Sequence, residues 1–205
     1  MKCRKPAEVI VLALCGALAG AGSALAQQQP VPPTPREVRP PTPQGGPTPA
    51  PPFSTQLQIS SPVFAANGSI PSKYTCDGPG MNPPLMFISV PAKTQSLALI
   101  VDDPDVPKDL VPSGVFDHWL IWDLPPDTTG FGEGAGKGGI NGMGQTGYLG
   151  PCPPDREHRY FFKLYALDTK LTAVKIANKK DLETAMQGHV IQRAELMGKY
   201  QRTGK

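Results

Sequence analysis

The distribution of proline most constrains what this chain can fold into. Eleven of the 26 residues in 27–52 are proline, and large apolar side chains are almost absent there. Such a segment cannot bury enough apolar surface to offset the conformational entropy that folding costs. We expect an extended, polyproline-like spacer over 27–52, with a docking strip for a partner or for the cell wall as the alternative. The folded domain is therefore confined to 53–205.

The first 26 residues have the three parts of a secretory signal peptide. Three basic residues precede an apolar run over 9–19, and an Ala-x-Ala pattern ends at Ala26. The apolar run is too short to span a bilayer. We expect cleavage after Ala26, a mature chain in the periplasm or outside the cell, and no stable membrane insertion of that chain. Lipid attachment is disfavoured because Cys15 follows a leucine inside the apolar run.

Residues 53–205 form one domain by size, with enough chain for a substantial core. The sequence has 20 Lys and Arg against 17 Asp and Glu; three of the former and one of the latter lie in 1–26, which leaves 17 against 16. A net charge of +1 provides no electrostatic basis for binding nucleic acid or an acidic membrane surface.

Only Cys76 and Cys152 remain once the leader has been removed. Two cysteines in an oxidising compartment suggest one disulfide. This bond would close a loop of about 75 residues and, by unfolded-state entropy, would stabilise the domain by roughly 4 kcal/mol. Two buried free thiols are the alternative, since the sequence does not show the geometry.

The domain is predicted to be mainly β. Short runs of β-branched, aromatic and leucine residues, bounded by Pro, Gly or Asp, predict strands over 85–90, 96–101, 116–124 and 159–167. From Asp181 the apolar spacing becomes helical through His189, and a second short helix is expected over 190–198. Strands followed by a helical C-terminus indicate a β-sandwich with a few short peripheral helices.

Ten glycines lie between Gly130 and Gly150, which predicts a long irregular loop. The run does not match a phosphate-binding Walker loop, because Phe131 stands where its first glycine belongs and Gly138 where a Ser or Thr belongs. It also fails the dinucleotide fingerprint, which follows a strand and opens a helix. We attribute the glycines to flexibility of the loop.

The segment Asp103-Pro-Asp-Val-Pro107 is a stiff backbone element that carries two carboxylates. Pro104 disfavours a helical conformation at Asp103, and in an extended chain Asp103 and Asp105 point to one side. The two groups could form an acid/base pair, a metal site or a turn whose side chains bond their own backbone. Taken alone, the segment fits the turn best.

Two histidines and a tyrosine accompany these carboxylates. His118 lies in an apolar strand, where a lone histidine is more often a hydrogen-bonded core residue than a functional one. His158 and Tyr160, however, share one face of a predicted strand, so that imidazole and phenol can converge on one ligand. An imidazole N–H held by a carboxylate beside a tyrosine O–H suits phosphate or carboxylate groups. The third histidine, His189, is interpreted as structural.

These motifs resemble the phosphatidylethanolamine-binding protein family, in its bacterial Raf-kinase-inhibitor-like branch, over residues 57–202. The matching stretches, in chain order, are Tyr74-Thr-Cys-Asp-Gly78, Pro83-Pro-Leu85, Asp103-Pro-Asp-Val-Pro107, Asp117-His-Trp119, Gly147-Tyr-Leu-Gly-Pro-Cys-Pro-Pro154, His158 to Asp168 and Gly188-His189. The resemblance implies a Greek-key β-sandwich with a surface cavity for anions such as phosphate, acetate or a phospholipid head group. Its implied pocket residues are Asp103, Asp105, Pro107, His118, Pro153, Pro154, His158 and Tyr160.

The leading hypothesis is an exported binding protein for a small anionic or phosphorylated group, without cofactor, metal or catalytic residues. Relatives inhibit kinases or proteases, which implies a protein target such as an export-side protease or a host protein, but resemblance does not specify that target. A homodimer is compatible with the same interpretation.

The rival hypothesis is a metal-dependent hydrolase in which His118, His158 and Asp103 or Asp105 bind a metal that activates water. Against it, no further imidazole ligand and no further acid/base pair is evident. A serine hydrolase is disfavoured because no Gly-x-Ser-x-Gly occurs, and a Cys152 nucleophile would compete with the disulfide.

Overall fold

The computed structural model describes residues 55–202. The predicted signal peptide (1–26) and spacer (27–52) lie outside the described residues. Within the described part, no helix is both long enough and apolar enough to span a membrane.

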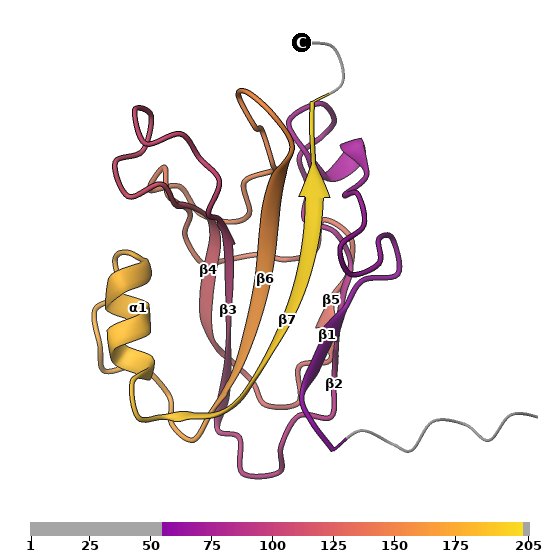
Figure 1. The fold of residues 1–205 in the computed structure, drawn as a ribbon. Coiled ribbons are helices and arrows are strands. Elements are labelled where there is room, and N and C mark those ends of the chain that lie inside the picture. Colours follow the sequence, from indigo (N-terminus) through magenta and orange to yellow (C-terminus); the bar gives the residue numbers. More distant parts are fainter. Residues whose placement is uncertain (1–54, 203–205) are drawn as a thin grey trace, which may run out of the picture. The chain divides into compact units, whose positions relative to one another are not determined.

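The described residues form two antiparallel sheets and one α-helix, as Figure 1 shows. The smaller sheet has the order β1-β2-β5 and the larger has the order β4-β3-β6-β7. The strands are β1 (Gln58–Ser60), β2 (Leu85–Ile88), β3 (Ser96–Asp103), β4 (Phe116–Leu124), β5 (Gly130–Phe131), β6 (His158–Leu167) and β7 (Val190–Tyr200); the helices are the 3-10 turn η1 (Ser72–Tyr74) and α1 (Lys179–Met186).

The core lies between the two sheets. Alternate residues of each strand point inward, as the period of a β-strand requires, and they form one continuous apolar cluster. Within this cluster the rings of Trp119 and Phe131 join β4 to β5, with centroids 4.9 Å apart. The prediction of a mainly β sandwich is confirmed.

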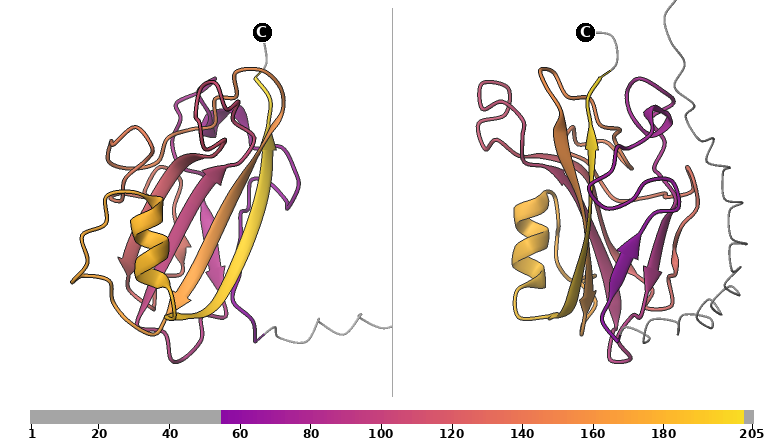
Figure 2. Two further views of the ribbon diagram at one scale, coloured as in Figure 1. Left: turned by 60° about the vertical axis from the view of Figure 1, so that its left-hand side comes forward. Right: turned by 45° about the vertical axis from the view of Figure 1, so that its right-hand side comes forward.

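Strand β3 is buried along its whole length, because both faces of the larger sheet are covered at this strand. One face meets the small sheet, and α1 covers the other through Leu182 and Met186, which pack with Ala98 and Ile100. Figure 2 shows the helix on the side of the larger sheet that faces away from the small sheet. The helix begins where Asn178 accepts a hydrogen bond from the backbone of Asp181 at 3.0 Å.

The predicted second helix over 190–198 is wrong, because this segment is strand β7. Helix α1 ends at Met186, and Gly188, with a φ of +83°, reverses the chain. The following residues pair with β6 from Val190 to Tyr200, and Leu196, Gly198 and Tyr200 are buried at a spacing of two. Pairing with the free edge of β6 therefore decides the conformation of this segment. The helical spacing of its apolar residues is accidental.

The glycine-rich segment does more than provide flexibility. A Cβ placed on Gly136 would lie 2.3 Å from the ring of Trp119, and one on Gly139 would lie 2.2 Å from the carbonyl oxygen of Leu120. Ile140 also forms two backbone hydrogen bonds with Leu120. The glycines thus allow this segment to pack closely against strand β4.

Candidate functional site

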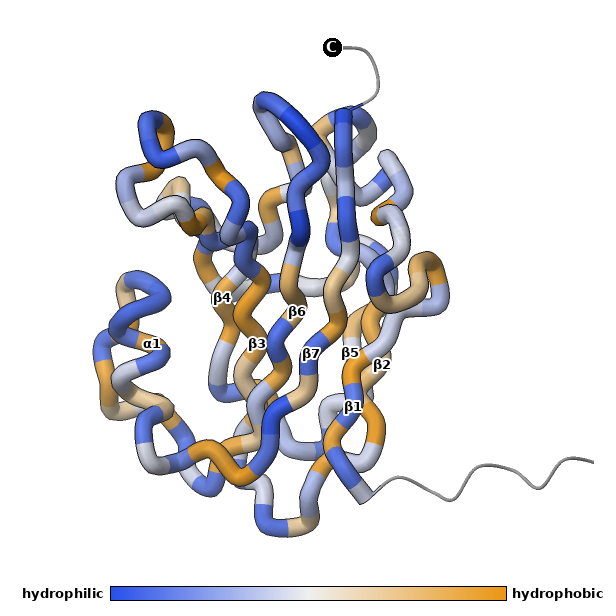
Figure 3. Tube along the Cα trace, in the orientation of Figure 1, coloured by the Kyte–Doolittle hydropathy of each residue, from blue (hydrophilic) through white to orange (hydrophobic). Residues whose placement is uncertain are grey.

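The candidate site lies where the end of β3 meets the start of β6, at the loop end of the larger sheet. In Figure 1 this is the upper end, near the C-terminus. Figure 3 shows mostly hydrophilic loops there, above strands that are largely hydrophobic. The loops bring together segments that are far apart in the sequence and surround a cavity.

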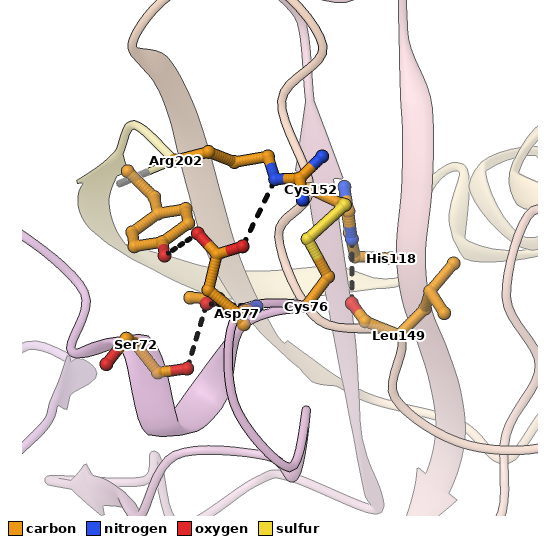
Figure 4. Close-up of a disulfide and its surroundings, with 9 residues drawn as sticks. Ser72, Cys76, Asp77, His118, Leu149, Cys152 and Arg202 are labelled. Atoms are coloured by element: carbon orange, nitrogen blue, oxygen red, sulfur yellow. Dashed lines mark hydrogen bonds and ion pairs between the residues drawn. A yellow bond between two sulfur atoms is a disulfide. The ribbon is translucent and has the colours of Figure 1, made fainter. Parts of the chain in front are cut away.

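The imidazole of His118, a residue of β4, makes one short hydrogen bond. Its Nδ1 lies 2.7 Å from the carbonyl oxygen of Leu149, and the side chain is almost completely buried (Figure 4). A carbonyl only accepts hydrogen bonds, so Nδ1 carries the proton and the neutral ring has its lone pair on Nε2. Burial lowers the pKa of His118, although the Leu149 carbonyl and the charge of Asp103 oppose this effect. His118 therefore offers the cavity a neutral imidazole at pH 7.

Asp103 and His158 form a buried pair behind His118. The carboxylate Oδ2 of Asp103 lies 2.7 Å from Nδ1 of His158, and its Oδ1 accepts the backbone N–H of Asp105 at 2.8 Å. Nε2 of His158 in turn lies 2.8 Å from Asp155. Carboxylates accept only, so these contacts require a proton on both ring nitrogens or on one carboxyl group. The predicted fixing of an imidazole by a carboxylate is present.

Tyr160 carries a buried hydroxyl that meets no partner at full hydrogen-bond geometry among the described residues, although the Asp103 carboxylate lies close enough to interact with it. Its ring stacks on His158 at 6.5 Å and meets His118 edge-on at 5.2 Å. Burial, followed by the negative charge of Asp103, raises the pKa of Tyr160, so the phenol stays protonated and can donate. Leaving such a group unsatisfied costs about 1–3 kcal/mol, so a further acceptor for this hydroxyl would stabilise the site.

The cavity has a volume of about 570 Å³. Asp103, His118 and Pro154 line it, whereas His158 and Tyr160 lie behind its surface. This volume is within the range of small-molecule sites. The structure therefore brings five of the eight predicted pocket residues to one place.

The remaining predicted residues lie elsewhere. The chain turns at Asp105 instead of continuing extended, and its carboxylate binds Arg159 in a bidentate manner at 2.6 and 2.8 Å. This guanidinium lowers the pKa of Asp105. Pro107 accepts two backbone hydrogen bonds within the loop, and Pro153 lines a separate crevice of about 30 Å³. Since the chain is not extended here, the two carboxylates have different partners, and the turn interpretation of Asp103 is confirmed.

Sequence reasoning missed the apolar side of the cavity. Val106, Leu110, Val111 and Phe116 line it, and Leu110 is 60% exposed. The only signal in the sequence was a Leu-Val pair inside a proline-bounded loop, where polar residues are more usual. These side chains make the cavity suitable for a ligand with an apolar part as well as a polar group.

The predicted disulfide between Cys76 and Cys152 is confirmed, with Cα atoms 5.3 Å apart. Both half-cystines line the cavity, so the bond joins the loop after η1 to the loop before β6 at the cavity wall.

Within residues 55–202, no group of three or more His, Cys, Asp or Glu side chains is arranged to hold a metal ion. Both ring nitrogens of His158 already contact carboxylates. The metal-binding set of the rival hypothesis is therefore not preformed.

Comparisons with known proteins agree with this architecture. The family model described as phosphatidylethanolamine-binding protein matches residues 60–201. A UPF0098 protein of Chlamydia pneumoniae is 47% identical over 150 residues, which cover 72% of this chain and all of the relative. A UPF0098 protein of Methanothermobacter thermautotrophicus is 47% identical over 155 residues, covering 71% of this chain and 99% of the relative.

Two crystal structures are similar in fold. A putative phosphatidylethanolamine-binding protein homologue from Chlamydia trachomatis is 42% identical with a TM-score of 0.68, covering 73% of this chain and all of the other. YbcL of Escherichia coli, described as a new member of the mammalian family, is 26% identical with a TM-score of 0.62, covering 72% and 99%. This chain belongs to the phosphatidylethanolamine-binding protein family.

Proposed function

We propose that this protein is an exported binding protein whose pocket captures a small anionic or phosphorylated group. The observation that carries the proposal is a cavity that His118 and Asp103 line, with the buried hydroxyl of Tyr160 behind it. A ligand oxygen that reached this hydroxyl would accept a hydrogen bond from it.

The protonation states of the site favour a phosphate that retains one proton. Tyr160 can donate, whereas the neutral Nε2 of His118 accepts. A singly protonated phosphate offers both an acceptor oxygen and a donor P–OH group, so it satisfies both side chains. Asp103 lines the same cavity, but its charge is engaged by His158, which reduces its repulsion of an anion.

The apolar side of the cavity supports a ligand larger than a bare ion. A head group at Tyr160 and His118 would leave an attached chain against Leu110 and Phe116, which line the same cavity. The description of the family as phosphatidylethanolamine-binding supports a phosphorylated head group of this kind.

We also propose that the protein is exported and acts on a protein partner. The leader ending at Ala26 supports export, which fractionation and N-terminal sequencing of the mature chain would test. We infer that the protein acts by binding, with an export-side protease or a host protein as its target, and that it catalyses no reaction. Metal analysis and a metal-dependent hydrolysis assay would overturn this if metal were bound stoichiometrically and hydrolysis required it.

The direct test is titration of the mature protein with phosphate and phosphoethanolamine, followed by NMR of the imidazole rings. We expect saturable shifts of the His118 signals. Tyr160→Phe removes one hydroxyl and should weaken binding by roughly 10- to 100-fold, because hydrogen bonds to charged groups contribute about 1.5–3 kcal/mol. Tyr165→Phe is the matched control, since Tyr165 lies on the opposite face of β6. Equal affinities for both variants, or no saturable shift in the unmodified protein, would contradict the proposal.

A further inference from the structure

The Cys76–Cys152 disulfide is unusually accessible for a bond that joins two distant segments. Both half-cystines are exposed, and both line the 570 Å³ cavity. Figure 4 shows the bond between them. A small molecule in the cavity can therefore reach a sulfur atom without local unfolding. Exposed disulfides are the ones that take part in thiol exchange, whereas buried ones resist it.

The two loops that the disulfide joins are also connected by other contacts. The backbone N–H of Cys76 donates to the carbonyl oxygen of Pro151 at 3.0 Å, and the Tyr148 hydroxyl donates to that of Tyr74 at 3.2 Å. On the far side, the Tyr200 hydroxyl donates to Asp77 at 2.6 Å. We expect these bonds to hold both loops on the sheets when the sulfur–sulfur bond opens, which would make its cleavage a local event.

The same cavity contains a group that can activate a thiol. His118 lines it, and its Nε2 has no hydrogen-bond partner among residues 55–202 once Nδ1 is bound to Leu149. A neutral imidazole is a suitable acceptor for the proton of a thiol, and the thiolate is the form that attacks a disulfide.

We propose that the Cys76–Cys152 disulfide is a thiol-exchange site in the wall of the cavity, with a low-molecular-weight thiol as its substrate. The thiol gives its proton to Nε2 of His118, and the resulting thiolate attacks one cystine sulfur. The bond between Cys76 and Cys152 breaks as a mixed disulfide with the incoming thiol forms. The released cysteine leaves as a thiolate, which takes the proton back from the imidazolium.

The experiment uses reduced glutathione as the probe, with the mature protein in phosphate-free buffer. The mixed disulfide is trapped with acid, peptide mass spectrometry locates the adduct, and a maleimide tag measures the rate at which a cysteine is released. We expect one glutathione per protein on Cys76 or Cys152, while the amide spectrum stays native. His118→Gln should slow release by about tenfold or more, as expected when a general base is lost. His189→Gln is the matched control, because His189 is exposed outside the cavity.

A second variant keeps the test decisive if His118→Gln does not fold. Leu110→Trp enlarges a side chain of the cavity wall and should slow exchange, whereas Val174→Trp, at another exposed position, should not. The proposal is overturned if no adduct forms, if reduction unfolds the domain, or if both cavity variants react at the rate of their controls. Phosphate is left out so that it does not compete with glutathione for the cavity.

Discussion

The Asp103 carboxylate and the His158 imidazole lie 2.7 Å apart, and both side chains are almost completely buried. Asp103 ends β3 and His158 begins β6, and the two strands are paired up to the register of Asp102 with Phe161. The contact therefore fixes the imidazole at the junction of two central strands. Tyr160, two residues further along β6, lies beside both histidines.

Asp103→Asn should lower the free energy of unfolding by roughly 3 kcal/mol, because it breaks a buried, hydrogen-bonded carboxyl–imidazole pair. Urea unfolding at pH 7 measures this loss. Asp155→Asn is the control, since Asp155 contacts the same imidazole from a much more exposed position. Equal losses for the two variants would show that burial does not decide the strength of the pair.

Tyr160→Phe should stabilise the ligand-free protein by up to about 1–3 kcal/mol, because it removes a buried hydroxyl that makes no hydrogen bond of full geometry in the described structure. The same variant should bind phosphate more weakly. Thermal or urea unfolding with and without phosphate separates the two effects. A lower stability without phosphate would mean that the hydroxyl is already satisfied.

The protonation of His118 should couple stability to pH. Burial depresses its pKa in the folded state below 6.5, so the unfolded chain binds more protons between the folded-state pKa and 6.5. Stability contributed by this group is complete above pH 6.5 and is lost as the pH falls through that window. Urea unfolding from pH 7.5 to 5.5 should show the decrease, and His118→Gln should flatten it. An unchanged slope in the variant would assign the effect to another group.

Leu110→Ser should reduce the affinity for a phosphorylated ligand that carries a short acyl chain by roughly fivefold, since losing apolar contact of this size costs about 1 kcal/mol. Affinity for inorganic phosphate should not change. Isothermal titration with both ligands measures the difference, and Val174→Ser is the control at another exposed position. Equal losses for both ligands would place Leu110 in contact with the head group.

Gly136→Ala should destabilise the domain by about 1–3 kcal/mol, because the added methyl group would overlap the Trp119 ring. Gly132→Ala is the matched control, since its nearest contact would be 3.4 Å from the Ala135 side chain. The two urea-unfolding midpoints should therefore differ clearly. Similar midpoints would mean that the glycine-rich segment is loosely packed, as the sequence suggested.

Local sequence patterns were sufficient to predict strand β4 and helix α1. Strand β4 was expected over 116–124 and spans Phe116–Leu124, because its apolar residues are bounded by turn residues. Helix α1 follows the apolar spacing that begins at Leu182, and the disulfide joins Cys76 to Cys152, the two cysteines outside the expected leader. The shared face of His158 and Tyr160 follows from the two-residue period of a strand.

The sequence by itself therefore determined the β-rich class and most of the polar residues of the site, and it suggested the disulfide without excluding free thiols. Only the tertiary structure decided that 190–200 is a strand, that Asp105 turns to Arg159 and that an apolar wall completes the cavity. Each of these depends on a partner far away in the sequence: the edge of β6, a guanidinium on that strand, or a facing loop. Local propensity differs by about 1 kcal/mol between conformations, so such long-range contacts decide the outcome.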